Sequence, residues 1–226
     1  MNLRDLGLVL LIMVIWSLNY PVGKIGVAEV PPMMLIAIRF ALVALLLPFV
    51  KVPWGHMRRI FYLSIMIGAG HFAPNFTGLK YVDSGVAAIL NQLSVPFSSI
   101  LAAIFFKDRI GWRRALGLAL AFAGVAVLVG EPKRPTDLFG AFLTTAASLA
   151  WAISLIQTKF LKEVHPLSLV AWMTLMAVPL LVGLSLLLEE RPIAAALAAG
   201  WAGWGPILYM AVFVSIVSHS LWYMLV

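Results

Sequence analysis

Long apolar runs that are almost free of charge constrain this chain more than any other feature. A helical run of about twenty such residues crosses the roughly 30 Å hydrocarbon core of a bilayer. Helix is required because lipid offers no partners for backbone N–H and C=O groups. The sequence therefore predicts an all-α, multi-pass membrane protein with about eight transmembrane helices. We place them at residues 6–27, 32–50, 60–79, 84–106, 111–130, 138–158, 167–187 and 205–226.

The composition excludes a soluble globular domain. Hydrophobic residues make up 63% and charged residues 11% of the 226 residues, whereas soluble domains carry about 25% charged residues. The chain contains no cysteine, which excludes disulfides and thiolate metal sites. Its net charge of +7 comes mainly from basic residues in the short segments between apolar runs. We interpret this excess as a membrane-topology signal and expect membrane lipids, not nucleic acid, as partners.

The basic residues also predict how the chain is oriented. Cytoplasmic loops of membrane proteins are enriched in Lys and Arg. A cytoplasmic N-terminus puts ten Lys and Arg residues on the inner side and five on the outer side, so we predict that orientation. The ten are Arg4, Lys51, Arg58, Arg59, Lys107, Arg109, Arg113, Arg114, Lys159 and Lys162.

A three-residue pattern occurs twice, displaced by 135 residues. It consists of Trp16, Lys24 and Pro31, and then of Trp151, Lys159 and Pro166. The second copy begins in the sixth run, five runs after the first, and an odd number of crossings inverts a repeat. We therefore predict two inverted-topology repeats, residues 1–130 with five helices and residues 138–226 with three, joined by a linker at 131–137. Inverted repeats around a shared midplane site are typical of transporters.

Polar residues accompany a proline inside three of the runs. Each proline removes a backbone N–H, kinks its helix and leaves a carbonyl unpaired. Such groups are tolerated where they line a water-filled cavity or where neighbouring helices satisfy them. The pattern favours a polar cavity near the middle of the membrane, with ordinary hydrogen bonding around structural kinks as the alternative. The three groups are Asn19 with Pro21, His71 and Asn75 with Pro74, and Asn91 and Gln92 with Pro96.

Helical spacing brings aromatic residues onto the same faces. Trp16 lies three positions before Asn19, and Ser215, His219 and Trp222 are spaced to share one face. Trp16 and Trp151, the tryptophans of the repeated pattern, either form walls of a central path or pack between helices. His71 and His219 are either core residues or proton carriers. The predicted substrate-binding residues are Trp16, Asn19, His71, Asn75, Asn91, Gln92, Trp151, His219 and Trp222.

Arg39 lies inside the predicted span 32–50, about seven residues from its outer end. A charge at that depth requires polar partners or water. We expect Arg39 to have a structural role, with the anchoring of a substrate carboxylate as the alternative.

Several stretches resemble EamA-type transporters of the drug/metabolite transporter superfamily, in particular exporters of O-acetylserine and cysteine. The matching stretches are Ile15-Trp16-Ser17-Leu18-Asn19-Tyr20-Pro21-Val22-Gly23-Lys24, Pro31-Pro32, Ile38-Arg39-Phe40, Ser94-Val95-Pro96-Phe97 and Phe105-Phe106-Lys107-Asp108-Arg109. At residues 107–109 the family has Gly-Glu-Arg, where this chain has Lys-Asp-Arg. The resemblance implies a bacterial inner-membrane protein that exports small polar metabolites, such as amino acids or related compounds, by alternating access.

The family fold has ten helices in two inverted sets of five, and the second set here contains three. We expect the chain to be a fragment, or to be completed by another chain. A non-transporting assembly subunit, or an inactive fragment of a transporter, is the alternative function. An intramembrane enzyme is disfavoured, because the spans contain neither paired acids nor a nucleophile–base pair. We expect no cofactor and no metal, a small-molecule solute as ligand, and leave open a homodimer.

Overall fold

The structure is a computed structural model that describes residues 3–108, 110–130 and 136–225. These residues form helices and connecting segments, with no strand among them. The elements are α1 (Leu3–Glu29), α2 (Pro32–Ala44), η1 (Leu47–Phe49), η2 (Trp54–His56), α3 (Met57–Ile65), η3 (Met66–Phe72), α4 (Ala73–Tyr81), α5 (Ser84–Asn91), α6 (Ser94–Phe106), α7 (Trp112–Val129), α8 (Leu138–Thr158), η4 (Lys159–Leu161), α9 (Pro166–Leu188), α10 (Pro192–Ala198), α11 (Gly200–Tyr209), η5 (Met210–His219) and α12 (Ser220–Leu225).

The all-α, multi-pass fold class is confirmed. Seven helical stretches of the described chain are long and apolar enough to cross a membrane. They correspond to seven of the eight runs read from the sequence. The remaining run, 60–79, is also helical throughout, as α3, η3 and α4, but His71 and Asn75 make it more polar than the others.

Two features differ from the sequence prediction. The stretch 188–204, which lies between two of the predicted runs, contains α10 and the first residues of α11. The run 84–106 is divided into α5 and α6 by a turn at Gln92 and Leu93. Of the predicted linker 131–137, residues 131–135 lie outside the described residues, as does Arg109. Asp137 caps α8, where its Oδ1 accepts a hydrogen bond of 2.7 Å from the Gly140 backbone N–H.

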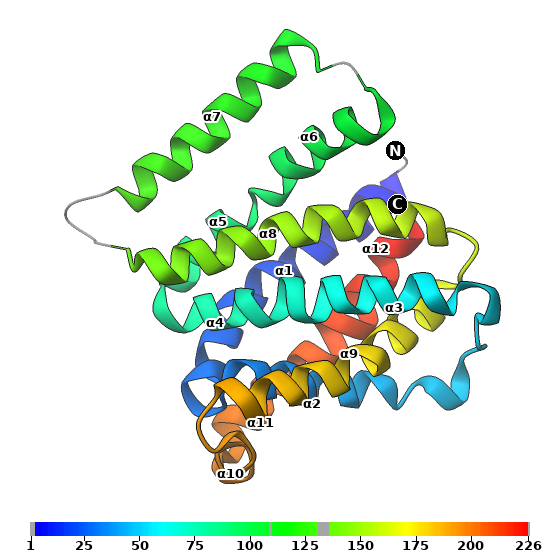
Figure 1. The fold of residues 1–226 in the computed structure, drawn as a ribbon, viewed down its shortest axis with the longest axis vertical. Helices are drawn as coiled ribbons and strands as arrows, with labels where there is room; N and C mark the ends of the chain where they lie inside the picture. The colour runs from blue at the N-terminus through cyan, green and yellow to red at the C-terminus, as the bar shows by residue number, and fades with distance from the viewer. Residues whose placement is uncertain (1–2, 109, 131–135, 226) are drawn as a thin grey trace.

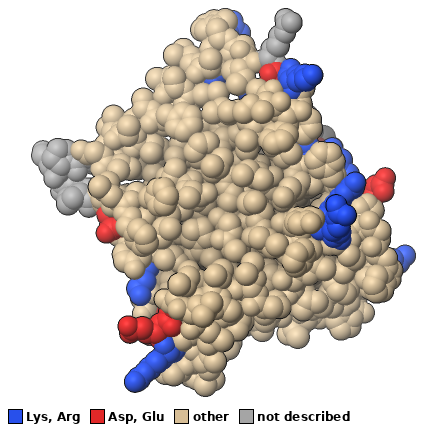
Figure 2. All heavy atoms as spheres, in the orientation of Figure 1, with Lys and Arg blue, Asp and Glu red and all other residues tan. Residues whose placement is uncertain are grey.

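The helices that build the core come from both parts of the chain. α2 packs along α9, and α4 packs along α8, so α3, η3 and α4 lie between α8 on one side and α2 with α9 on the other (Figure 1). α6 and α7 extend from the α8 side, and α7 has no buried residue. Figure 2 shows charged side chains near the edges of the molecule, with a broad uncharged face between them. This distribution suits a surface in contact with lipid.

Glycines allow α4 and α8 to approach closely. A Cβ at Gly78 would lie 2.7 Å from the Gly140 carbonyl oxygen, and a Cβ at Gly140 would lie 2.7 Å from the Tyr81 Cβ. Gly68 faces Ala177 of α9 in the same way, with 2.9 Å between the two Cβ positions. Small residues are enriched where membrane helices meet, because association there depends on close packing.

The carboxylate of Glu189 joins the end of α9 to the start of α2. It accepts hydrogen bonds from the backbone N–H groups of Met33, at 2.7 Å, and Met34, at 3.1 Å. The buried hydroxyl of Ser185 donates a third bond, at 2.6 Å. Unpaired N–H groups and the helix dipole both favour a negative charge at a helix N-terminus.

We expect Glu189→Ala to lower the free energy of unfolding by about 1–2 kcal/mol, the usual loss when a helix cap is removed. The measurement is thermal unfolding of the purified protein in detergent. Glu190→Ala is the matched control, since Glu190 is the exposed neighbour. Equal unfolding temperatures for the two variants would show that Glu189 does not act as a cap.

Candidate functional site

One cavity, of about 490 Å³, is lined by helices from both halves of the chain. All nine residues predicted to bind substrate line it: Trp16 and Asn19 of α1, His71 of η3, Asn75 of α4, Asn91 of α5, Gln92 of the following turn, Trp151 of α8, His219 of η5 and Trp222 of α12. The structure therefore brings the nine together, and their role in binding stays a prediction. Side chains of Tyr20, Phe72, Ser98 and Leu155 also line the cavity and were missed. Tyr20 lies four positions after Trp16, a spacing that could have identified it.

Two tryptophans and two histidines form a cluster in the cavity wall, which we call the Trp–His quartet: Trp16, Trp151, His71 and His219. The indole centroids of Trp16 and Trp151 are 6.1 Å apart, with the rings nearly perpendicular. Trp16 contacts His219 at 5.6 Å, and Trp151 contacts His71 at 4.9 Å. Each tryptophan thus pairs with a histidine from the other half of the chain. This crossed pairing ties the two halves together at the cavity.

Both histidines lie in segments of π-helix, where backbone bonds connect residues five positions apart. His71 is the second-last residue of η3, and His219 is the last residue of η5. Each Nδ1 donates to a carbonyl oxygen, His71 to Ala147 at 2.9 Å and His219 to Val214 at 2.5 Å. Because a carbonyl only accepts, these bonds place the proton of the neutral ring on Nδ1.

The π-helical turn changes which residues of η5 face the cavity. Sequence spacing placed Ser215 on one face with His219 and Trp222, as in an α-helix. In the structure Val214, not Ser215, lines the cavity beside His219. The wider turn puts His219 five positions after the residue whose carbonyl it contacts.

Several buried polar atoms of the cavity wall have no hydrogen-bond partner in the part of the chain that the structure describes. They are the Oδ1 atoms of Asn19, Asn75 and Asn91 and the Nε1 atoms of Trp16 and Trp222. Asn91 also donates a short hydrogen bond from Nδ2 to the Tyr20 hydroxyl. Unpaired buried polar groups are destabilising and are rare in native structures. The wall therefore offers carbonyl acceptors and indole donors to a polar molecule in the cavity.

One of the expected unpaired carbonyls is paired. Pro96 has no N–H to bond the Gln92 carbonyl, but the Val95 N–H donates to that oxygen at 3.0 Å. A tighter turn between α5 and α6 thus compensates for the proline. The polarity at this kink comes from the Asn91 and Gln92 side chains.

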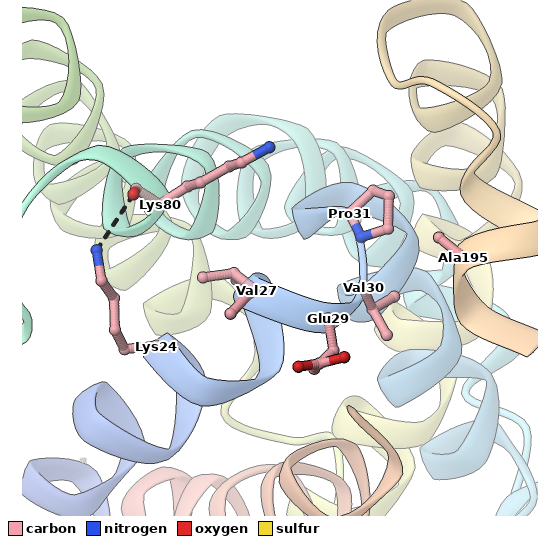
Figure 3. A pocket seen from close by; sticks show the side chains of 8 residues that line it. Lys24, Val27, Glu29, Val30, Pro31, Lys80 and Ala195 are labelled. Carbon is pink, nitrogen blue, oxygen red and sulfur yellow. Dashed lines mark hydrogen bonds between the residues drawn. The ribbon is translucent and has the colours of Figure 1, made fainter. Parts of the chain in front are cut away.

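A second, smaller cavity of about 240 Å³ lies beside the end of α1 (Figure 3). Lys24 and Lys80 are its basic residues and Glu29 its acidic one. The Lys24 ammonium donates to the carbonyls of Leu79, at 2.7 Å, Lys80, at 3.1 Å, and Val82, at 2.7 Å. It therefore caps the C-terminal end of α4, where carbonyls lack helical partners. This contact gives Lys24 a structural role, so the larger cavity is the stronger candidate site.

Comparison with known proteins agrees with this architecture. A model of the EamA-like transporter family matches residues 5–130 and 138–226. A probable amino-acid metabolite efflux pump of Salmonella typhimurium (strain LT2) is 31% identical over 98% of this chain and 78% of its own length. The Escherichia coli (strain K12) protein of the same description is 29% identical over the same shares. An uncharacterized transporter of Archaeoglobus fulgidus is 29% identical over 73% of this chain and 62% of its own length. With nearly its whole length matched in two successive stretches, this multi-pass chain belongs to the EamA-like transporter family.

Proposed function

We propose that this chain exports small polar metabolites, amino acids or related compounds, across the bacterial inner membrane. The observation that best supports this proposal is the set of unpaired side-chain carbonyl oxygens on Asn19, Asn75 and Asn91. All three residues line one cavity between the two stretches that match the family model. Amide oxygens accept hydrogen bonds from ammonium and amide groups, while indole rings cover apolar portions of a solute. The names of the two enterobacterial relatives support the same class of solute.

The proposed mechanism is alternating access. Residues 1–130 and 138–226 act as inverted repeats that rock about the cavity, with the N-terminus on the cytoplasmic side. Residues of both repeats line the cavity, so a rocking motion exposes it to one side of the membrane at a time. The Trp–His quartet contacts both repeats and would change its crossed pairs during this motion.

The test is exchange of labelled amino acids by the chain in proteoliposomes, with Asn19→Ala, Asn75→Ala and Asn91→Ala as variants. Each variant removes one acceptor, and we expect each to lower solute affinity by about tenfold, the equivalent of one hydrogen bond to a charged group. Gln157→Ala is the control, since Gln157 is an amide of α8 that does not line the cavity. Normal exchange by all three asparagine variants would disprove the site.

A further inference from the structure

Arg39 is a fully buried cation without a counter-charge. It belongs to α2 and is 0% exposed. Its Nε donates to the Ser215 hydroxyl at 2.8 Å, while Nη1 and Nη2 have no hydrogen-bond partner among the described residues. None of the nine acidic residues of the chain lies within the eight apolar runs. A buried charge is strongly unfavourable unless it is paired and hydrogen-bonded, so the guanidinium lacks the partner that its position requires.

One layer of side chains separates Arg39 from the large cavity. The Phe72 ring lines that cavity, and the Arg39 Cζ lies 4.7 Å from the centre of this ring. Phe72 also contacts both histidines, with centroid distances of 4.7 Å to His71 and 6.1 Å to His219. On the η5 side, Ser215, the hydrogen-bond partner of Arg39, follows Val214 of the cavity wall. The guanidinium therefore lies directly behind the wall.

We propose that Arg39 is the counter-charge for a carboxylate on the exported solute. This inference rests on the proposed function and specifies its substrate class as α-amino carboxylates. Charges interact strongly across a few ångströms of low-dielectric protein. The Arg39 guanidinium therefore attracts an anion in the cavity even without direct contact between the two. The free Nη1 and Nη2 match the two oxygens of a carboxylate, which reaches them when the Phe72 ring turns aside.

The other polar atoms of the cavity complete the recognition of a zwitterion. Asn75 follows Phe72 by three positions, and its free Oδ1 is an acceptor for an ammonium group. The Oδ1 atoms of Asn19 and Asn91 add two further acceptors. A bound amino acid thus places its carboxylate toward Arg39 and its ammonium toward the asparagines.

A purely structural role for Arg39 makes a different prediction. In that case the bond to Ser215 and the contact with Phe72 hold α2 against η5, and the charge has no effect on which solute binds. Substituting Arg39 then lowers stability and reduces the binding of all solutes equally. An anchoring role predicts a selective loss that depends on the carboxylate.

The experiment measures binding by quenching of tryptophan fluorescence, since Trp16, Trp151 and Trp222 line the cavity. The probes are L-serine, L-leucine and L-phenylalanine, each paired with its carboxamide, which keeps the ammonium and loses the negative charge. We expect the protein to bind each acid about tenfold or more tightly than its carboxamide. Arg39→Met should remove this preference and leave carboxamide binding unchanged, while Arg39→Lys, which keeps the charge, should retain part of it. Arg59→Met is the control, since Arg59 is an exposed arginine that donates to the Phe160 carbonyl.

The comparison of acid with carboxamide needs no variant, so it stands even if Arg39→Met fails to fold. Equal binding of both forms overturns the anchor and leaves the proposed function intact, as does a preference that survives in a folded Arg39→Met. Failure of the unmodified protein to bind any acid or carboxamide overturns the proposed function together with the anchor.

Discussion

Replacing Gly78 with valine should prevent α4 and α8 from meeting and should give the largest loss of stability of any single change described. The space for a side chain is already occupied, because a Cβ at Gly78 contacts Thr144 Oγ1 and lies 2.7 Å from the Gly140 carbonyl oxygen. Neither atom can move away easily. The Gly140 oxygen belongs to the α8 backbone, and the Thr144 hydroxyl donates a hydrogen bond of 3.0 Å to that oxygen. The helices must therefore move apart.

We expect a loss of about 3 kcal/mol or more, at the upper end of the range for overpacked cores, and a fall in the unfolding temperature by roughly 10 °C. The measurement is thermal unfolding in detergent, followed by gel filtration to detect aggregation. Gly124→Val in α7 is the matched control, because no heavy atom lies within 4 Å of a Cβ added there. If the two valine variants unfold at the same temperature, the close approach of α4 and α8 is not a determinant of stability.

Replacing either tryptophan of the quartet with alanine should abolish efficient exchange of small amino acids. Trp151 touches Trp16, His71 and His219, so its removal leaves a void that joins the cavity. Trp16 and Trp151 are half-buried, so truncation should cost less than the about 3–5 kcal/mol that is typical of a fully buried aromatic side chain. A wider cavity also holds a small solute in many orientations. We expect exchange of L-serine to fall by at least about tenfold, with a smaller loss for L-phenylalanine, which fills part of the void.

The two variants also test the proposed repeat. In the proposed repeat Trp16 and Trp151 occupy equivalent positions, so Trp16→Ala and Trp151→Ala should have similar effects on exchange. Trp201→Ala is the control, because Trp201 of α11 is 77% exposed. A large loss in one quartet variant with normal exchange in the other would contradict a symmetric role.

The bilayer explains why so much of this fold could be predicted from sequence. Each apolar run must be helical and must cross the membrane, so the runs leave few alternatives for α1, α7, α8 or α9. The high free-energy cost of a polar side chain in lipid also allowed the cavity residues to be predicted. Asn19, Asn75 and His219 are polar at membrane depth, and such residues seldom face lipid.

Contacts between distant residues could not be predicted in this way. Lys24 caps α4 across more than fifty residues of sequence, and Glu189 caps α2 across more than one hundred and fifty. In the sequence both are simply charged residues close to the ends of apolar runs. The π-helical turns were also missed, since the spacing of apolar residues carries little information about whether a backbone bond spans four or five residues. For this reason Ser215 was placed with His219, whereas its hydroxyl bonds Arg39.

The π-helical segments η3 and η5 contain more residues per turn than an α-helix does. If such a segment rewinds by one residue, from hydrogen bonds that span five positions to hydrogen bonds that span four, the helix beyond it rotates by about 100°. This is the angle that one residue subtends in an α-helix. His71 and Phe72 lie at the end of η3, and His219 lies at the end of η5. Rewinding would carry these rings out of the cavity wall while the helix as a whole stays continuous. Each half of the protein thus contains a segment whose rewinding would replace the side chains that line the cavity, without unfolding a transmembrane helix.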